Sequence, residues 1–168
     1  MSHCSEVKDL RPFWKSEVTD TKDVRESVLN SEGYGPNLIV FDGECVLCSW
    51  FFKFMLRHDK LRCFQFATAQ SPLGQKLYQQ LGLPTRNFET NLVIVDGVVY
   101  QHLDAFAAAM RQLPGMWKLL SICRFLPKAL KVPVYRLIAR NRYNLFGRSG
   151  ACLMPGADVK ARFASDGF

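Results

Sequence analysis

The stretch NLIVFDGECVLCSWFFKF, residues 37–54, places two cysteines three positions apart where a β-rich run changes into a helical pattern. Residues 38–41 are a short apolar run of β-forming side chains, which indicates a buried strand. From Cys45 to His58 most positions are apolar and polar side chains recur at every fourth position, which predicts a helix deep in the fold. Cys45 therefore stands at the beginning of a predicted helix, just after a strand.

Downstream of this stretch, strand and helix signals alternate. Ser71 and Pro72 are typical of a helix beginning, and Asp96-Gly97 is the strongest short signal for a hairpin turn. The predicted elements are a strand at 62–66, a helix at 71–82, a hairpin at 91–100 and helices at 102–113, 116–126 and 128–145. This order predicts an α/β fold: a thioredoxin-like core, with a central four-stranded mixed sheet flanked by helices, and a C-terminal helical extension.

The chain divides into four predicted parts. They are a flexible polar N-terminal extension (1–36), a thioredoxin-like core with the cysteine pair (37–113), basic C-terminal helices packed on the core (114–155) and a tail (156–168). Residues 105–156 carry nine Lys/Arg and no Asp/Glu. Such a block attracts anionic partners, whether lipid head groups, nucleic acid or acidic protein, unless it is an ordinary solvated cationic face.

Bulk composition places the chain among ordinary globular proteins. Hydrophobic residues make up 48% and charged residues 22% of its 168 residues, so disulfides are not needed to replace a missing core. No secretory signal precedes the six cysteines, which predicts a reducing, cytoplasmic location. The apolar stretches are far shorter than the roughly 18 residues of a membrane span, so we expect a soluble protein.

The position of the cysteines predicts their chemistry. At a helix N-terminus, unpaired N–H groups and the helix dipole stabilise a thiolate, so the pKa of Cys45 is expected to fall from about 8.5 toward neutrality. Cys48, one turn further on, can resolve the mixed disulfide that Cys45 forms. Asp42 has three roles open to it: accepting a proton from the resolving thiol, raising the thiolate pKa, or shaping the turn with Gly43.

Other interpretations of the cysteines stay open. One pair is only half of a typical four-ligand zinc site, although distant cysteines or histidines could complete it, and Cys45 and Cys48 could simply pack as small apolar residues. Cys63 and Cys123 are predicted to be core residues. Cys152 is a candidate distant resolving or regulatory thiol, and His102 is a weaker candidate for a titrating group.

The segment 135–148 alternates cations with aromatic and aliphatic residues. Its apolar members Leu137, Ile138 and Leu145 suit docking onto the core, which predicts a packed amphipathic helix with its cations on the surface. Those cations could hold a thiolate or an acidic substrate, or contact an anionic membrane. We expect no specific nucleic-acid binding.

Three segments resemble the DCC family of thiol-disulfide oxidoreductases, which is named for Asp-x-x-Cys-x-x-Cys. They are DGECVLC (42–48), VDGVVYQHLDAFAAAMRQLPG (95–115) and VYRLIARNRYNLFGRSGAC (134–152), and the likeness covers about 38–155. The resemblance implies a thioredoxin-like fold with Asp42, Cys45 and Cys48 as the active site. Ordinary thioredoxins carry a cis-proline before the strand that faces the cysteines, whereas this chain has Thr90 and Asn91 there.

The sequence thus predicts a thiol-disulfide oxidoreductase in which Cys45 is the nucleophile, Cys48 the resolving thiol and Asp42 a modulator or proton acceptor. Its partners would be a disulfide-containing protein or small-molecule substrate and a reductant, and no organic cofactor is expected. The alternative is a non-catalytic thioredoxin-like binding module. Such a module would offer its basic C-terminal helices to a protein or an anionic membrane, with cysteines that are incidental or hold a metal.

Overall fold

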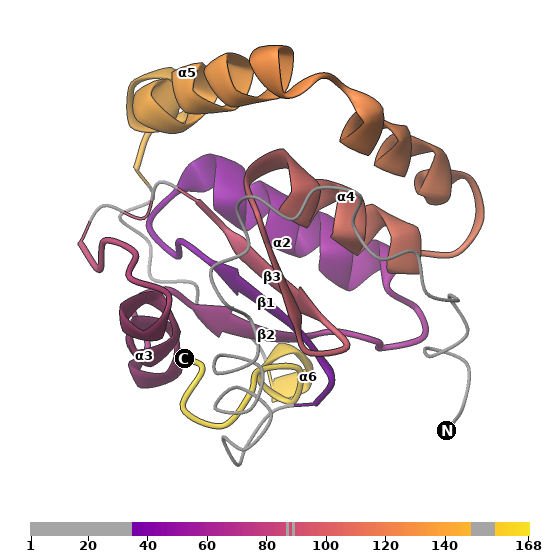
Figure 1. Cartoon of the computed structure of the whole chain (residues 1–168). Helices are drawn as coiled ribbons and strands as arrows, with labels where there is room; N and C mark the ends of the chain where they lie inside the picture. Colours follow the sequence, from indigo (N-terminus) through magenta and orange to yellow (C-terminus); the bar gives the residue numbers. More distant parts are fainter. Residues whose placement is uncertain (1–34, 87, 89, 149–156) are drawn as a thin grey trace.

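The computed structural model describes residues 35–86, 88, 90–148 and 157–168 (Figure 1). The predicted N-terminal extension lies almost wholly outside the described residues, and so does Cys152. Within the described part of the chain, no helix has the length and apolar character that crossing a membrane requires.

A four-stranded mixed sheet forms the centre of the fold. Its strands are β1 (Asn37–Phe41), β2 (Gln65–Thr68), β3 (Leu92–Val95) and β4 (Val98–Gln101), in the order β2-β1-β3-β4. β1 pairs with β2 in parallel, whereas β3 is antiparallel to both of its neighbours. This topology confirms the predicted α/β class and is consistent with a thioredoxin-like core.

Helices cover both faces of this sheet (Figure 1). They are α2 (Val46–His58), α3 (Pro72–Gln80), α4 (His102–Gln112), the 3-10 helix η1 (Gly115–Phe125), α5 (Lys128–Phe146) and α6 (Ala157–Lys160). α2 and α4 pack on one face and α3 on the other, while η1 and α5 form an outer layer beyond α2 and α4. The C-terminal extension therefore lies on the same side of the sheet as the cysteine helix.

The alternation of side chains along β1 explains the two cores. Ile39 and Phe41 pack on the side of α2 and α4, and Phe41 stacks on Phe52 with the ring centroids 4.5 Å apart. Leu38 and Val40 point to the opposite face and pack with the residues of α3. A strand buried on both faces reads as a continuous apolar run, which is why this stretch was recognisable in the sequence.

Local signals placed the connections correctly. Ser71 caps α3 by accepting a hydrogen bond from Gly74 N at 3.1 Å, and Pro72 is the first residue of that helix. Asp96 and Gly97 have φ angles of 50° and 75°, the left-handed conformation that a tight hairpin turn requires at both positions. The predicted helix beginning and hairpin turn are confirmed.

The second strand begins later than the predicted 62–66. The backbone N–H groups of Cys63 and Phe64 donate to the buried carboxylate of Asp59, at 2.9 and 3.0 Å, and so make no ladder bonds. Cys63 is partly buried and packs against the core beside α2, as predicted, but it is disulfide-bonded, which the sequence did not predict.

The C-terminal segment after α6 lies along the outer edge of β2. Phe66 N donates to Arg162 O at 2.9 Å, and Ala164 N donates to Phe66 O at 2.9 Å. The guanidinium of Arg162 also binds the Asp59 carboxylate at 2.6 Å. The segment thus pairs with backbone groups that an edge strand would otherwise expose.

The orientation of α5 is the largest departure from the sequence analysis. Leu137 and Leu145, expected to dock onto the core, are 65% and 66% exposed, and Ile138 is exposed as well. Arg142, expected among the surface cations, is only 4% exposed. The prediction was wrong because acidic side chains of the core region hold the cations of α5: Asp42 pairs with Arg142, and Asp104 with Lys131.

The close approach of α3 to the end of β2 yields a test of this packing. A Cβ atom added at Gly74 would lie 2.1 Å from Thr68 O and 2.8 Å from Ala69 Cα, both backbone atoms. We expect Gly74→Ala to lower the free energy of unfolding by about 3 kcal/mol, because helix and strand must separate. Urea unfolding measures this loss.

Gly82→Ala is the matched control. Gly82 has φ +64° but nothing within 4 Å of an added Cβ, so its substitution costs only the left-handed backbone strain, about 1 kcal/mol. If both variants lose the same free energy of unfolding, the close approach of α3 to the end of β2 is contradicted.

Candidate functional site

Cys45 is the N-cap residue of α2, which is where the sequence predicted a sulfur. Its Sγ accepts a hydrogen bond from Cys48 N at 3.5 Å, and its carbonyl accepts one from Ser49 N at 2.9 Å. The turn that precedes it is closed by Cys45 N, which donates to Asp42 O at 3.3 Å. The sulfur therefore occupies the place of the oxygen of an ordinary capping side chain.

The two thiols are adjacent and differ sharply in acidity. A hydrogen bond from the Cys48 side chain is the main cause that lowers the pKa of Cys45 to about 6, with burial opposing it and Cys48 N and the Arg142 guanidinium assisting. The same hydrogen bond, together with burial, raises the pKa of Cys48. These shifts favour a thiolate on Cys45 and a proton on Cys48.

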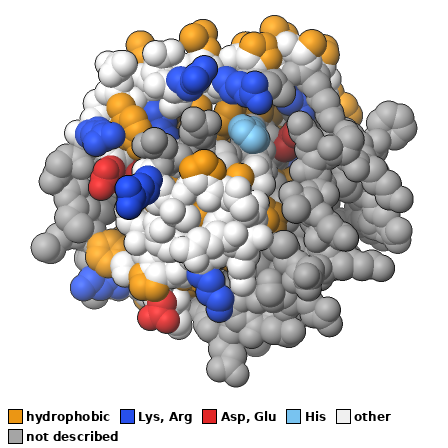
Figure 2. Space-filling view, turned by 60° about the vertical axis from the view of Figure 1, so that its left-hand side comes forward, with side chains coloured by type: hydrophobic (Ala, Val, Ile, Leu, Met, Phe, Trp, Pro, Cys, Tyr) orange, Lys and Arg blue, Asp and Glu red, His pale blue; other side chains and the backbone are white. Residues whose placement is uncertain are grey.

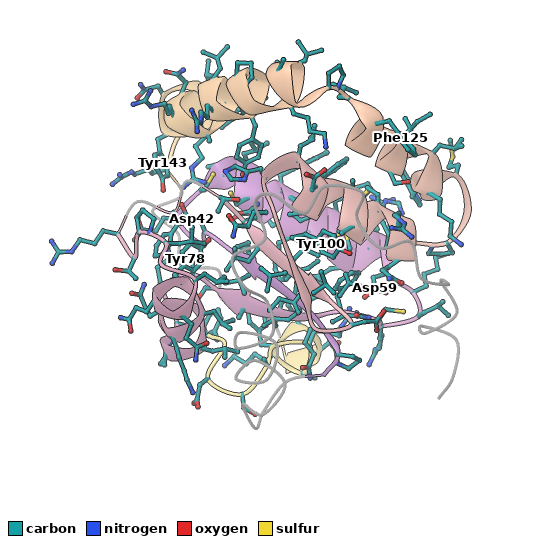
Figure 3. All side chains as sticks on the ribbon, in the orientation of Figure 1. Asp42, Asp59, Tyr78, Tyr100, Phe125 and Tyr143 are labelled. Atoms are coloured by element: carbon teal, nitrogen blue, oxygen red, sulfur yellow. The ribbon has the colours of Figure 1, made fainter. Side chains whose placement is uncertain are left out.

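Asp42 is fully buried at the end of β1, and each of its carboxylate oxygens has two partners. Oδ1 accepts from Glu44 N at 3.0 Å and from Gln70 Nε2 at 2.7 Å. Oδ2 accepts from Arg142 Nη2 at 2.9 Å and from the hydroxyl of Tyr143, which points from α5 toward Asp42 (Figure 3). The bond to Glu44 N shows the turn-shaping role, and the negative charge of Asp42 slightly raises the pKa of Cys45.

Arg142 connects the carboxylate to the cysteine pair. Its Nη1 lies 3.9 Å from Cys48 Sγ, and its Nη2 donates to both Asp42 and the hydroxyl of Tyr143, the latter at 3.0 Å. Burial alone would lower the pKa of the guanidinium, but the charges around it raise the pKa, so Arg142 stays cationic. Its Nε is buried without a hydrogen-bond partner.

Neither Arg142 nor Tyr143 was predicted as a site residue by name. Both belong to the segment 134–152 that resembles the DCC family, and Arg142 is one of the cations of 135–148 that were expected to be able to hold a thiolate. Their separation from Asp42, by 100 and 101 residues, gives no local pattern in the sequence.

The backbone just after α5 meets Cys45. Arg148 forms an antiparallel backbone bridge with Cys45, and its guanidinium lies over the ring of Tyr143 at 4.5 Å. Cys45 is 0% and Cys48 4% exposed. In this state neither sulfur is open to a substrate, so a reaction at Cys45 requires the residues that cover it to move.

Thr90 lies two residues before β3, and the described residues contain no cis peptide bond. Its hydroxyl accepts from His102 N at 2.9 Å and lies 3.5 Å from the hydroxyl of Tyr135, while its carbonyl accepts from the hydroxyl of Tyr78. Burial is the main cause that raises the pKa of both tyrosines, and the charge of a Cys48 thiolate would raise it further.

The remaining predicted residues lie apart or outside the described chain. His102 packs its ring against that of Tyr135, with the centroids 4.8 Å apart. Cys123 is a free, partly buried thiol on η1, and burial raises its pKa. Among the described residues, no three His, Cys, Asp or Glu side chains gather closely enough to hold a metal ion. Cys152 lies outside those residues.

Comparisons with known proteins fit this arrangement. YuxK of Bacillus subtilis (strain 168), an uncharacterized protein, is 36% identical over 135 residues, covering 80% of this chain and 98% of YuxK. A chloroplastic DCC family protein of Arabidopsis thaliana is 29% identical over 116 residues, covering 68% of this chain and 67% of that protein. No solved structure matches.

A family model described as DCC1-like thiol-disulfide oxidoreductase matches residues 39–148. The match begins in β1 and ends at Arg148, so it includes Asp42, both cysteines, Arg142 and Tyr143. With more than half of its length matched, this chain belongs to the DCC1-like thiol-disulfide oxidoreductase family.

Proposed function

We propose that the protein is a thiol-disulfide oxidoreductase in which Cys45 attacks the disulfide of a protein or small-molecule substrate. One observation carries this proposal: Cys45 Sγ lies at the N-terminus of α2 beside the N–H and S–H groups of Cys48, which lower the pKa of Cys45 to about 6. A thiolate is the reactive form of cysteine in disulfide exchange. At neutral pH this site would hold that form without any metal or organic cofactor.

The reaction takes two exchange steps. The Cys45 thiolate attacks one substrate sulfur, the substrate S–S bond breaks, and the first substrate thiolate leaves. Cys48 then gives up its proton and attacks Cys45, which releases the second substrate thiolate and leaves a Cys45–Cys48 disulfide. The proton of Cys48 ends on one of the two product thiols. A separate dithiol reductant must then reduce the new disulfide and return the protein to its starting state.

Asp42 and Arg142 act as positioning residues in this proposal. Asp42 holds the guanidinium at 2.9 Å, and that guanidinium stands 3.9 Å from Cys48 Sγ, where a positive charge favours a thiolate. Loss of the proton from Cys48 is the difficult step, because burial and the hydrogen bond to Cys45 raise the pKa of Cys48. Once Cys45 is bonded to substrate its negative charge is gone, and the neighbouring cation then stabilises the Cys48 thiolate.

A substrate can reach the buried sulfurs only if the residues around them move. Arg148 pairs its backbone with Cys45, and the partly buried Gly147, with φ +81° and nothing within 4 Å of an added Cβ, lies directly before it. We propose that the C-terminal end of α5 swings away from Cys45 when substrate binds, breaking the backbone bridge of Arg148.

A non-catalytic binding module is the second candidate, and the burial of both sulfurs favours it. In that case Cys45 and Cys48 only pack against the core, and their acidity has no use. The two candidates differ in whether the cysteines can exchange with a disulfide.

Insulin reduction by the dithiothreitol-reduced protein distinguishes them. We expect the wild type to accelerate the reaction and Cys45→Ser to lose about a hundredfold or more of that rate, because the nucleophile is gone. Cys48→Ser should stop at a mixed disulfide with insulin, visible by non-reducing mass spectrometry. Cys123→Ser is the control and should keep the wild-type rate. A wild type no faster than Cys45→Ser would exclude the enzymatic function.

The acidity of Cys45 also predicts a pH dependence of stability that needs no access to the sulfur. Its pKa falls from 9.0 in the unfolded chain to about 6 in the fold, so between these values the unfolded chain binds more protons. The stabilisation is complete above the higher value and is lost as pH falls through about 6.

We therefore expect the difference in unfolding free energy between the reduced wild type and Cys45→Ala to grow from about pH 6 to about pH 8. Urea unfolding at both pH values measures this difference. The packing that Cys45→Ala removes lowers the free energy of unfolding equally at both pH values, so it cancels when the two differences are compared. Cys123→Ala serves as the control, because burial raises rather than lowers the pKa of Cys123. If this difference does not change with pH, Cys45 does not titrate as a stabilised thiolate.

The buried ion pair predicts a coupling between Asp42 and Arg142. Arg142→Gln should lower the free energy of unfolding by about 3 kcal/mol, because it leaves a buried carboxylate without its cation. The double variant Asp42→Asn/Arg142→Gln should recover about 1 to 2 kcal/mol of that loss. Arg140→Gln, on the exposed side of the same helix, is the control. A loss in Arg142→Gln no larger than in Arg140→Gln would contradict the pairing.

A further inference from the structure

α5 turns two of its cations inward and most of its large aliphatic side chains outward. Lys131 and Arg142 are buried, whereas six apolar side chains of the helix are between 41% and 66% exposed. One of them is Phe146, and the other five are Leu130, Val134, Leu137, Ile138 and Leu145. Their spacing of four, seven, eight and fifteen positions from the first places them on one stripe of a helix. An amphipathic helix normally faces its apolar stripe to the core, so this stripe lacks a partner within the described structure.

The apolar stripe continues onto η1. Of the sixteen exposed large apolar side chains in the described chain, twelve lie between Met116 and Phe146. Those on η1 are Met116, Leu119, Leu120, Ile122 and Phe125, with exposures from 43% to 75%. In Figure 1, η1 and α5 run along the same outer side of the molecule. We call the exposed apolar side chains of η1 and α5 the outer surface; their concentration there indicates a binding surface rather than scattered exposure.

Positive charge borders the outer surface. Lys118, Arg136 and Arg140 are exposed on the same two helices, and no acidic residue occurs anywhere in 105–156. Figure 2 shows apolar side chains along the upper rim of the molecule with Lys and Arg side chains directly beside them. A partner that fits this surface must have an apolar region that the exposed side chains can enter and negative charge for the bordering cations.

We propose that the outer surface binds the anionic surface of a lipid bilayer, with η1 and α5 lying in the plane of the interface. Apolar side chains would enter the boundary between head groups and acyl chains, and the bordering cations would contact anionic head groups. A second copy of the chain fits less well, because it would bring the same cations against each other. The proposal does not depend on the redox activity, since the cysteines and the ion pair of Asp42 lie beneath α5.

Vesicle sedimentation of the full chain tests the proposal directly. The probes are vesicles of phosphatidylcholine alone and of phosphatidylcholine with about 30% phosphatidylglycerol, a charge density in the range that attracts basic segments. We expect binding to the anionic vesicles that is at least about tenfold stronger than to the neutral ones, and that weakens as salt is raised.

Two sets of variants separate the apolar and ionic contributions. Leu137→Gln/Leu145→Gln should weaken binding to anionic vesicles by about tenfold or more, because two side chains lose their apolar burial. Arg136→Gln/Arg140→Gln should weaken it by about fivefold or more and reduce its dependence on salt. The matched control is Leu61→Gln: Leu61 is 57% exposed but lies in the loop after α2, and its substitution should leave binding unchanged.

All these positions are exposed, so circular dichroism should show that each variant folds. Binding that is absent, or that is equal for neutral and anionic vesicles, would overturn the proposal. It would also be overturned if Leu61→Gln weakened binding as much as Leu137→Gln/Leu145→Gln, or if light scattering showed a dimer in solution that Leu137→Gln/Leu145→Gln dissociates.

Discussion

The ion pair between Asp42 and Arg142 determines how the C-terminal helix meets the core. Asp42 is fully buried at the end of β1, and an unpaired carboxylate in such a place costs several kcal/mol. Arg142 reaches it at 2.9 Å from α5, one hundred residues later in the chain. Because this pair requires one face of α5 to point inward, it fixes the rotation of the helix about its own axis. The pairing of Lys131 with Asp104 at 2.6 Å supports the same rotation.

Two features of the molecule follow from that rotation. On its inner side, α5 brings a cation to within 3.9 Å of Cys48 Sγ, and Arg148, two residues after the helix, pairs its backbone with Cys45. On its outer side, the leucines that would otherwise pack on the core face outward. The chemistry of the cysteine pair and the apolar exterior therefore have one physical origin, which is the need to neutralise a buried carboxylate.

The parts of this structure that sequence reasoning predicted are those specified by neighbouring residues. Asp96-Gly97 specified a hairpin turn, Ser71 specified a helix cap, and the spacing of Cys45 and Cys48 placed both sulfurs at the beginning of one helix. The order of these elements was sufficient for the fold class. Each of these features depends on side chains within a few positions of each other, so a local pattern carries it.

The parts that were missed depend on contacts across the chain. Apolar spacing in α5 indicates a core-facing stripe in most proteins, and nothing near Leu137 or Leu145 reveals that Asp42 needs a cation from the opposite side of the helix. The burial of Cys45 was only one of the alternatives that the sequence left open, since the backbone that pairs with Cys45 comes from the distant Arg148. Long-range ion pairs determine which face of α5 meets the core, whereas the periodicity of its apolar residues alone predicts the other face.

The central claim is that one thiolate, on Cys45, exists near neutral pH. Thiolate absorbance in the ultraviolet, recorded against pH for the reduced wild type with Cys45→Ser subtracted, measures it most directly. We expect a single transition with a midpoint close to pH 6, equal to one thiolate per chain. A difference spectrum that shows no thiolate until the pH reaches about 8.5, the range of an ordinary cysteine, would show that Cys45 is not a thiolate at neutral pH.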